Sequence, residues 1–302
     1  MNATLLKIIV VTALGLFAAG ISAAEKPYVV FLGTGAADIH APDGCHCPNC
    51  TYIREHGQRN RRRYSSLYVD PGLVIDFTTT GMAGLQAARI APAEVKCLLI
   101  THSHGDHFDA PAIVQLAEER AKKTPGPLPV FGNATVTAAL KKHLASLKRS
   151  VPLAPAEVTA YRDFAAGGWT CTPMLANHDP SQQCLFYVLT KGELGVLYAT
   201  DTTWFPVKTF YAIARKKLDL AIVEGTFGPQ TDPSYLIGHM TFAFDRLVRK
   251  WLMDSKTLKP GGTFAVTHLS LHWVPPYDLV VEPLGKEGIV VSYDGLKLPI
   301  GK

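Results

Sequence analysis

The sequence predicts a single-domain, layered α/β fold. Short apolar runs rich in Val, Ile and Leu alternate with amphipathic segments along the chain. Turn residues separate these runs, and we find no linker, internal repeat or low-complexity tract that would divide them. The 302 residues are 47% hydrophobic and 18% charged, which is enough for a sizeable core and argues against a disordered chain.

Residues 1–24 have the pattern of a secretory signal peptide. Lys7 is followed by an apolar stretch over residues 8–21 and then by the small residues Ser22-Ala23-Ala24. This stretch is shorter than the roughly 20 apolar residues that a spanning helix needs. We expect cleavage after Ala24, a mature domain of residues 25–302 that is periplasmic or secreted, and no membrane span after cleavage. An uncleaved N-terminal anchor is the alternative.

Apolar runs bounded by turn residues are expected to form strands. They cover residues 28–32, 66–69, 73–76, 95–100, 184–189, 195–199, 218–223, 263–267 and 289–293. Segments with apolar residues at three- and four-residue spacing are expected to form helices, and they cover residues 112–122, 135–147, 208–217 and 240–253. Asp109, which precedes Ala110-Pro111, and Asn133 are the expected helix starts.

A group of metal-binding residue types follows the predicted strand 95–100. Three His and one Asp fall within the stretch Thr101-His-Ser-His-Gly-Asp-His107. Neutral imidazole and carboxylate are ligands of Zn²⁺ and similar ions. Four donors this close cannot all bind one tetrahedral ion that keeps an open position. The spacing therefore favours two ions, with His102 and His104 on one and Asp106 and His107 on the other. A His-rich surface loop is the alternative.

Three further candidate ligands each follow an apolar run, where a rigid sheet can position them. They are His178, Asp201 and His268. The carboxylate of Asp201 can bridge both ions. The expected ligand set of the two-ion centre is therefore His102, His104, Asp106, His107, His178, Asp201 and His268.

These residues, in this order, resemble the metallo-β-lactamase-fold hydrolases over nearly the whole mature chain. The resemblance implies a four-layer αβ/βα sandwich with two divalent ions, zinc or manganese, at one edge of the two sheets. The stretch Leu73-Val-Ile-Asp76 is similar to the family's first motif, whose Asp orients a metal-bound His without binding the metal. The resemblance implies that Asp76 takes this role here. Because His104 stands where the di-iron redox branch usually has Glu, the chain resembles the hydrolytic branch.

A cysteine cluster over residues 44–50 narrows the resemblance. The stretch Gly44-Cys45-His-Cys47-Pro-Asn-Cys50 has spacing suited to one structural Zn²⁺ if a fourth ligand exists. The pattern is similar to the carbon–phosphorus lyase accessory phosphodiesterases, in which a His shortly after the last active-site His is the fourth ligand. That implies His272, although the family spacing would place the ligand at Leu271.

Disulfides are the alternative for these cysteines, because nearby cysteines usually pair in an oxidising compartment. Pairing would require Cys97, Cys171 or Cys184. These three lie in apolar runs and are more typical of small buried hydrophobic residues, so zinc is the favoured interpretation.

Three other features bear on the site. Gly238-His239 precedes the predicted helix 240–253, and in the resembling subfamily the His at this place is a candidate general acid. His239 and Asp201 are therefore the expected catalytic residues. Trp204 and Trp273 follow ligands closely enough to line a pocket. The Arg-rich residues 54–63 can grip phosphate, but a solvated face with structural ion pairs is the favoured interpretation.

A two-ion centre indicates hydrolysis without naming a substrate. The resemblance favours small phosphodiesters, cyclic nucleotides or ribose phosphodiesters, with His239 protonating the leaving alkoxide. The net charge of +5 is far from that of a protein that wraps nucleic acid, so a small-molecule substrate is expected, and a homodimer remains open.

The export signal disagrees with a cytoplasmic carbon–phosphorus lyase role and favours a periplasmic scavenging phosphodiesterase. Three alternatives stay open. One is an oxidative enzyme similar to the pyrroloquinoline quinone biosynthesis B protein. The second is a lactam or thioester hydrolase on the same fold. The third is a secreted metal-binding protein without turnover.

Overall fold

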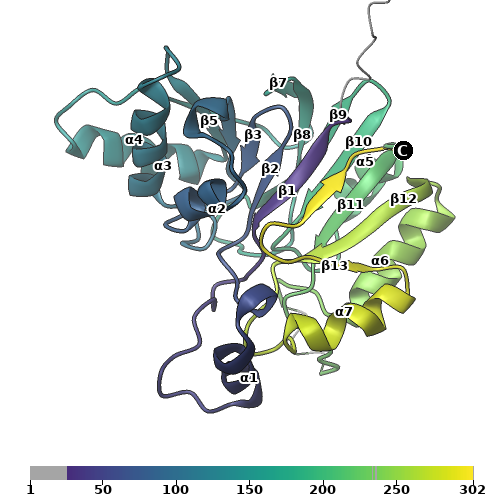
Figure 1. Cartoon of the computed structure of the whole chain (residues 1–302). Helices are drawn as coiled ribbons and strands as arrows, with labels where there is room; N and C mark the ends of the chain where they lie inside the picture. The colour runs from purple at the N-terminus through teal and green to yellow at the C-terminus, as the bar shows by residue number, and fades with distance from the viewer. Residues whose placement is uncertain (1–25, 233, 235–236, 302) are drawn as a thin grey trace, which may run out of the picture.

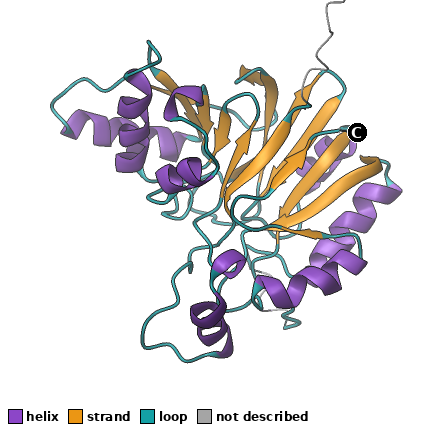
Figure 2. Cartoon of the chain, in the orientation of Figure 1, coloured by secondary structure: helices purple, strands orange, loops and turns teal. Residues whose placement is uncertain are grey.

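The computed structural model describes residues 26–232, 234 and 237–301. The predicted signal peptide lies outside these residues. The described chain forms two seven-stranded sheets that pack face to face, with helices on both outer surfaces (Figures 1 and 2). This is the α/β sandwich that the sequence predicts. None of the helices in the described part of the chain has the length and apolar character needed to cross a bilayer.

The first sheet is formed mainly by the N-terminal half of the chain. Its spatial order is β14 (Lys297–Pro299), β1 (Tyr28–Gly33), β2 (Ser66–Val69), β3 (Leu73–Ile75), β4 (Cys97–Leu99), β5 (Leu128–Gly132) and β6 (Leu153–Glu157). Strands β3 to β6 pair in parallel, and the other neighbours pair antiparallel.

The second sheet is formed by the C-terminal half. Its spatial order is β13 (Val290–Val291), β12 (Leu258–Thr267), β11 (Leu218–Glu224), β10 (Leu194–Ala199), β9 (Leu185–Lys191), β8 (Trp169–Leu175) and β7 (Phe164–Ala166). Strands β10 to β13 are parallel, and β8 runs in the same direction because it is antiparallel to β9, which is antiparallel to β10. The carboxyl ends of β8, β10, β11 and β12 therefore lie on one edge of the sheet.

The helices cover the outer faces and leave the loops at one edge uncovered (Figure 1). Helices α2 (Gly81–Ala87), α3 (Ala110–Ala121) and α4 (Ala134–Ser146) pack on the first sheet, and α5 (Val207–Ala214), α6 (Phe242–Asp254) and α7 (Tyr277–Lys286) pack on the second. Helix α1 (Pro48–His56) lies apart from the sandwich, on the segment that carries the cysteine cluster. The described residues also include the single-turn helices η1 (Gln58–Asn60) and η2 (Pro92–Glu94).

The two expected helix starts are confirmed. The side chain of Asp109 accepts a hydrogen bond from the backbone N–H of Ala112 at 2.7 Å, and Asn133 accepts one from Val136 at 2.8 Å. Each side chain satisfies one of the N–H groups that a helix leaves unpaired in its first turn.

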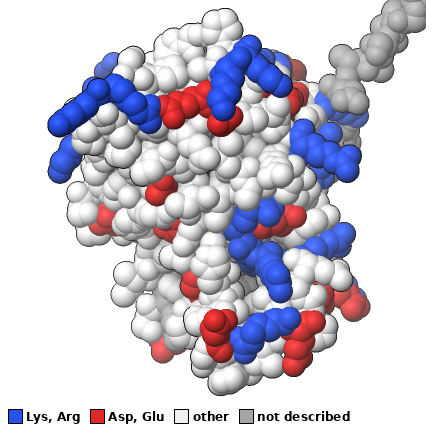
Figure 3. Space-filling view, turned by 60° about the vertical axis from the view of Figure 1, so that its left-hand side comes forward, with Lys and Arg blue, Asp and Glu red and all other residues white. Residues whose placement is uncertain are grey.

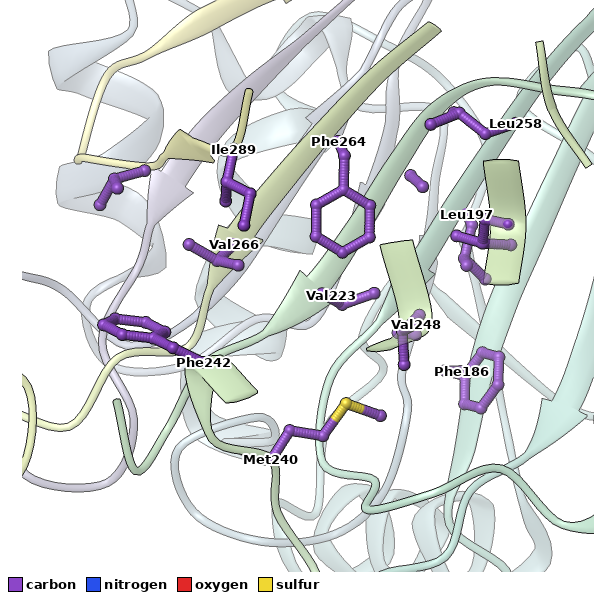
Figure 4. Close-up of a cluster of buried hydrophobic side chains, with 14 of the residues drawn as sticks. Phe186, Leu197, Val223, Met240, Phe242, Val248, Leu258, Phe264, Val266 and Ile289 are labelled. Carbon is purple, nitrogen blue, oxygen red and sulfur yellow. The ribbon is translucent and has the colours of Figure 1, made fainter. Parts of the chain in front are cut away.

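Three layers of apolar side chains hold the four layers together. Between the sheets, the buried side chains include Phe31, Trp169 and Tyr198. On the outer face of the second sheet, Val223 and its neighbours pack against Val248 of α6 (Figure 4). Each such side chain contributes about 1.5–3 kcal/mol when it is fully buried. The strand ends that carry the site are therefore anchored in a rigid frame.

The structure differs from the sequence prediction in several elements. Helix α6 begins at Phe242 rather than at residue 240, so Gly238 and His239 lie in the loop before it. Strands β5 and β6 are missing from the prediction, because β5 contains Pro129 and β6 is built largely from Pro and Ala where strands usually carry Val and Ile. Helix α7 contains Pro283, which weakens its helical signal.

Candidate metal centre

The seven predicted ligands lie together at the edge where the strands of both sheets end. The loop with His102, His104, Asp106 and His107 follows β4 of the first sheet, whereas His178, Asp201 and His268 follow β8, β10 and β12 of the second. Within the groups that their donor atoms form, every pair of atoms lies within 4.8 Å. One group is His102, His104 and His178, and another is Asp106, His107 and His268. These two groups divide the four residues of the motif in the same way as the prediction does.

Asp201 lies between the two groups. Its Oδ2 is 2.8 Å from Nε2 of His107, and its Oδ1 is 3.6 Å from Nε2 of His178. It also joins His102 and His107 in a third group of donor atoms. This is the position that a bridging carboxylate requires.

The donor atoms face one another in a way that a cation would explain. Nε2 of His178 lies 3.1 Å from Nδ1 of His104, and Nε2 of His107 lies 3.1 Å from Nε2 of His268. Nε2 of His102 is buried and makes no hydrogen bond with any described residue. Buried polar atoms are rarely left unpaired, so the residues present fit a metal at both groups.

The second ring nitrogen of each of four histidines is held by its own partner. The pairs are His107 Nδ1 with Asp76 Oδ2 at 2.7 Å, His104 Nε2 with Asp179 Oδ2 at 3.2 Å, His178 Nδ1 with the Gly238 carbonyl at 3.0 Å, and His268 Nδ1 with Thr226 Oγ1 at 2.8 Å. Such partners fix the tautomer and leave the other nitrogen to the metal. Asp76 thus stands where its predicted role requires.

Three residues of the site have left-handed backbones. The φ angles are 59° for Asp76, 52° for Asp201 and 53° for His268. Non-glycine residues rarely adopt this conformation, which costs about 1–3 kcal/mol and persists where the surrounding structure enforces it. Asp76 and His268 directly follow their strands, and Asp201 lies two residues after the end of β10, so the chain turns sharply at each point and the side chain stays at the sheet edge.

The electrostatics of the site favour bound cations. Burial lowers the pKa of His102 and of His178, so both imidazoles are neutral, as metal ligands must be. Burial also lowers the pKa of His107, but the carboxylates of Asp201 and Asp106 outweigh it and raise that pKa well above its usual value. Burial raises the pKa of both carboxyl groups, yet His107 more than reverses this and holds them ionised. The same negative charge would attract a metal ion.

His239 lies beside this centre and is held by a residue that the sequence reasoning missed. Nδ1 of His239 is 2.9 Å from Oε2 of Glu224 and 3.7 Å from Oδ1 of Asp201. Burial lowers the pKa of His239, but Glu224 outweighs it and raises the pKa to about 9. Glu224 is fully buried at the end of β11 and also accepts the backbone N–H of Thr202 and the hydroxyl of Thr226, each at 2.5 Å. The position of Glu224 directly after the apolar run 218–223 was the one sequence feature that could have identified it as a site residue.

A cleft of about 410 Å³ opens onto these residues. Besides metal-site side chains and His239, it is lined by Ala36, Ala37, Asp38, Phe227, Ser270 and Trp273. Trp273 therefore lines the pocket as predicted. The prediction for Trp204 is wrong, because its ring packs against Phe210 and Phe244 and it is not among the described residues that line the cleft.

The four predicted zinc ligands of the cysteine cluster also come together. Donor atoms of Cys45, Cys47, Cys50 and His272 all lie within 4.8 Å of one another, and Nε2 of His272 is 3.5 Å from the sulfur of Cys50. Leu271, where the family spacing would place the ligand, is buried against Cys50 and Ile53. The one-residue displacement thus leaves Leu271 under the cluster and turns His272 toward the sulfurs.

The structure also places the cysteines that bear on the disulfide alternative. All six cysteines fall within the described residues and none forms a disulfide. Cys97, Cys171 and Cys184 are buried in the sandwich. The backbone N–H of Cys47 and hydrogen bonds from Cys50 and His272 lower the pKa of Cys45 to about 6, which favours its thiolate, whereas burial and the neighbouring sulfurs raise the pKa of Cys50 to about 12.

The Arg-rich residues 54–63 serve the structure rather than the cleft. Buried Arg62 donates to Thr34 Oγ1 at 3.0 Å, Arg63 donates to the Leu32 carbonyl at 2.7 Å, and Arg54 donates to the Cys45 carbonyl at 2.6 Å. None of these arginines is among the described residues that line the cleft. The contacts support the structural interpretation of the run.

Comparison with known proteins agrees with this architecture. A structure of a diphosphatase from the PhnP family matches with a TM-score of 0.71 and 20% identity, covering 90% of this chain and 96% of the other. Zn²⁺-bound PqqB from Methylobacterium extorquens gives 0.69 and 17%, covering 90% and 99%. The metallo-β-lactamase-fold protein YhfI from Bacillus subtilis gives 0.66 and 18%, covering 92% and 100%. These identities show the fold alone.

No curated protein sequence matches the chain. Residues 66–256, which are more than half of the sequence, match the family described as the beta-lactamase superfamily domain. That stretch runs from β2 to the end of α6 and contains six of the seven candidate ligands of the centre. With the fold and the ligand arrangement in agreement, the chain belongs to the beta-lactamase superfamily.

Proposed function

We propose that the protein is a metal-dependent hydrolase that cleaves a phosphodiester in a small nucleotide or sugar phosphate. One observation carries the proposal. Asp201 lies close to one histidine of each of two groups of donor atoms that border a small cleft, and His239 is held by Glu224 at the same cleft. A storage site would need neither this intervening carboxylate nor the cleft.

The proposed centre holds two divalent ions, zinc or manganese, on the seven ligands named above. Bound there, such ions lower the pKa of water and stabilise negative charge that develops on a phosphoryl group. The residues of the chain keep the ligands oriented. Asp76 and Asp179 do so by accepting hydrogen bonds from ligand histidines.

His239 is proposed to protonate the leaving alkoxide. Its ring is part of the cleft wall, and Nδ1 is occupied by Glu224, which leaves Nε2 to hold the proton that is delivered. The Glu224 carboxylate raises the pKa of His239, which favours the protonated form that a general acid needs. His178, Asp201 and His239 also form a group of donor atoms within 4.8 Å, so a ligand role for His239 is the rival assignment.

The cleft supports a small substrate with one phosphate. Its volume of about 410 Å³ is near the lower end of the 300–1,000 Å³ that is typical of ligand pockets. Among the described residues that line it, none is Lys or Arg, so a second phosphate would find no basic partner there. Figure 3 shows basic side chains in separate groups interspersed with acidic ones on the face that it presents, rather than a continuous basic track. These features favour a small molecule over a nucleic-acid polymer.

The cysteine cluster is proposed to hold one structural Zn²⁺ on Cys45, Cys47, Cys50 and His272. The tetrahedral sulfur and nitrogen donor set is typical of structural zinc. The metal in the PqqB structure is zinc as well, although that similarity concerns the fold.

We also propose that the protein is exported after cleavage behind Ala24. N-terminal sequencing of exported protein should find Glu25 first, and intact Met1 in a membrane fraction would favour an anchor instead.

A substrate panel tests the proposed function. Protein reconstituted with Zn²⁺ or Mn²⁺ is assayed on bis-p-nitrophenyl phosphate, cyclic nucleotides, nitrocefin and a thioester. We expect hydrolysis of the phosphodiesters above the lactam and thioester, and loss of hydrolysis after chelation. Preferential turnover of nitrocefin or the thioester would overturn the phosphodiesterase assignment, and turnover of none would overturn the hydrolase. Gel filtration with light scattering separates a monomer from a homodimer.

A further inference from the structure

Part of the cleft wall is formed by aromatic side chains rather than by the polar metal ligands. Trp273 lines the cleft and is 41% exposed, an unusual degree of exposure for so large an apolar side chain. Phe227 lines the cleft beside it, with ring centroids 6.5 Å apart and planes 81° apart. The two rings form a corner. The ring centroid of Phe227 also lies 5.3 Å from that of His239. This aromatic corner adjoins the group proposed to deliver the proton.

The turn that carries Trp273 is fixed from both sides. Residue 268 before it is a ligand of the metal centre, and His272 beside it belongs to the cysteine cluster. The side-chain amide of Asn49, in helix α1, donates to the carbonyls of Leu271, His272 and Val274 at 3.0, 3.2 and 3.0 Å. Asn49 lies between Cys47 and Cys50, so the cysteine cluster and the Trp273 turn are one connected unit.

Asp38 completes this connection inside the cleft. Its Oδ2 accepts hydrogen bonds from Ser270 Oγ at 2.6 Å, from Nδ1 of His272 at 2.9 Å and from the backbone N–H of His272 at 3.1 Å. Asp38 and Ser270 both line the cleft. The wall that holds Trp273 therefore carries a negative charge, which would repel a second phosphate but accept a hydrogen bond from a hydroxyl or an N–H group.

We propose that Trp273 is a stacking platform for a nucleobase, so that the substrates are nucleotide phosphodiesters rather than esters of a bare sugar. This inference rests on the proposed phosphodiesterase function. A phosphate at the metal centre places the remainder of a small substrate in the same cleft, against the aromatic corner. Every nucleobase offers a flat π-face to such a ring, whereas the puckered ring of a furanose offers only C–H groups and a smaller contact area. Stacking of a base on an aromatic side chain corresponds to about 5- to 150-fold in affinity.

The test compares two esters that differ only in the base. They are 2′,3′-cyclic AMP and the 2′,3′-cyclic phosphate of methyl riboside, assayed for kcat/KM with the metal-loaded protein. The wild type is expected to prefer the nucleotide by about 5- to 150-fold. Trp273→Ala and Trp273→Leu should bring that ratio close to one, while Trp273→Phe keeps most of it. Tyr211→Ala, which removes an aromatic side chain that is 67% exposed on α5, is the matched control and should leave the ratio unchanged.

A binding measurement separates this inference from the proposed function. Calorimetry on the metal-loaded protein should show tighter binding of AMP than of ribose 5-phosphate, and Trp273→Ala should remove the difference. Base-dependent binding without hydrolysis of any phosphodiester would refute the proposed function and keep the stacking site. Hydrolysis with no preference for the base, a preference that survives in Trp273→Ala, or an equal loss on both esters would refute the stacking site. Metal content and circular dichroism of each variant exclude misfolding as the cause.

Discussion

The two candidate metal sites of this molecule are built in opposite ways. The ligands of the two-ion centre follow strands that are anchored by three apolar layers, and His102, His107 and His268 are almost completely buried. The cysteine cluster lies on a segment outside the sandwich, where Cys50 alone of its four donors is buried. The frame thus orders the first site before any metal arrives, whereas the second site depends on its own bonds. A metal there would contribute mainly to local folding, and a metal at the centre to chemistry.

The largest effect should come from Asp201, whose carboxylate lies between the two groups of donor atoms and is the proposed bridge. Asp201→Ala is expected to lower phosphodiester hydrolysis by about 10³-fold or more, because it removes a ligand of both ions. Elemental analysis should show loss of metal from the centre but retention of one zinc in the cysteine cluster, which confirms that the two sites are independent. Circular dichroism should be unchanged.

Two controls sharpen this result. Asp201→Asn tolerates the left-handed backbone better than Ala, so it separates the loss of charge from added strain. Asp254→Ala removes an exposed carboxylate at the end of α6 and should leave the activity at the wild-type level. Near-normal turnover by Asp201→Ala would show that the bridge is assigned wrongly.

The second effect concerns His239, the proposed proton donor, which lies beside the ordered site. His239→Ala should lower turnover of alkyl phosphodiesters by about 10²–10⁴-fold, the usual contribution of general acid catalysis. p-Nitrophenolate leaves without a proton, so the nitrophenyl ester should be affected much less. The metal content should stay at the wild-type level.

Glu224→Gln is the companion variant, since it keeps a hydrogen-bonding group beside His239 but removes the negative charge. It should give the same difference between substrates to a smaller degree. If His239→Ala loses both activities equally and also loses metal, His239 is a ligand instead.

A smaller effect is expected from the residues that orient the ligands. Asp179→Asn weakens the hydrogen bond to His104 and should reduce metal affinity at the centre by about 10–100-fold, as changes behind a metal ligand typically do. Titration of the metal-free protein with Zn²⁺ measures this affinity. Saturating metal should restore turnover, because the ligands themselves remain. A turnover defect that persists at saturating metal would mean that Asp179 does more than orient His104.

The smallest effect on rate is expected at the other site. Cys50→Ser should lower the zinc content by one ion per chain and make the segment around α1 more sensitive to protease. Hydrolysis of a nitrophenyl ester should fall by less than about tenfold, since the centre is ordered by the sheets. Cys97→Ser, at a cysteine in β4, is the control and should keep the zinc. Loss of metal from both sites in Cys50→Ser would show that the two-ion centre depends on the cysteine cluster.

The site residues that could be predicted are those that a short stretch of sequence identifies by itself. The ligands between His102 and His107 are recognisable because three His and one Asp lie within six residues. His178, Asp201 and His268 are recognisable by their position after apolar runs. Glu224 shares that position, but a single Glu after a strand has no ligand partner in sequence to single it out. The contact of Asp38 with His272 joins two loops more than 230 residues apart, and no local pattern encodes it.

The fold shows the same division. Strands rich in Val, Ile and Leu were predicted within a few residues, because their burial on both faces demands that composition. The edge strand β6 has only partly buried or exposed residues and can be built from Pro, Ala and Glu. Helix α1 is held by Cys47 at its start, with a hydrogen bond from the Cys50 N–H to the Cys47 sulfur, and by tertiary contacts rather than by helical periodicity.

Each candidate ion site draws its ligands from both halves of the chain. One group joins His102 and His104, after β4, to His178, after β8, and the other joins Asp106 and His107 to His268. A bound ion would therefore act as a cross-link between the two sheets, added to the apolar layer that already joins them. Separation of the sheets would require breaking coordinate bonds at their edge. The metal-free protein should then unfold at lower denaturant concentration, with the two halves parting first at the end where the cleft lies.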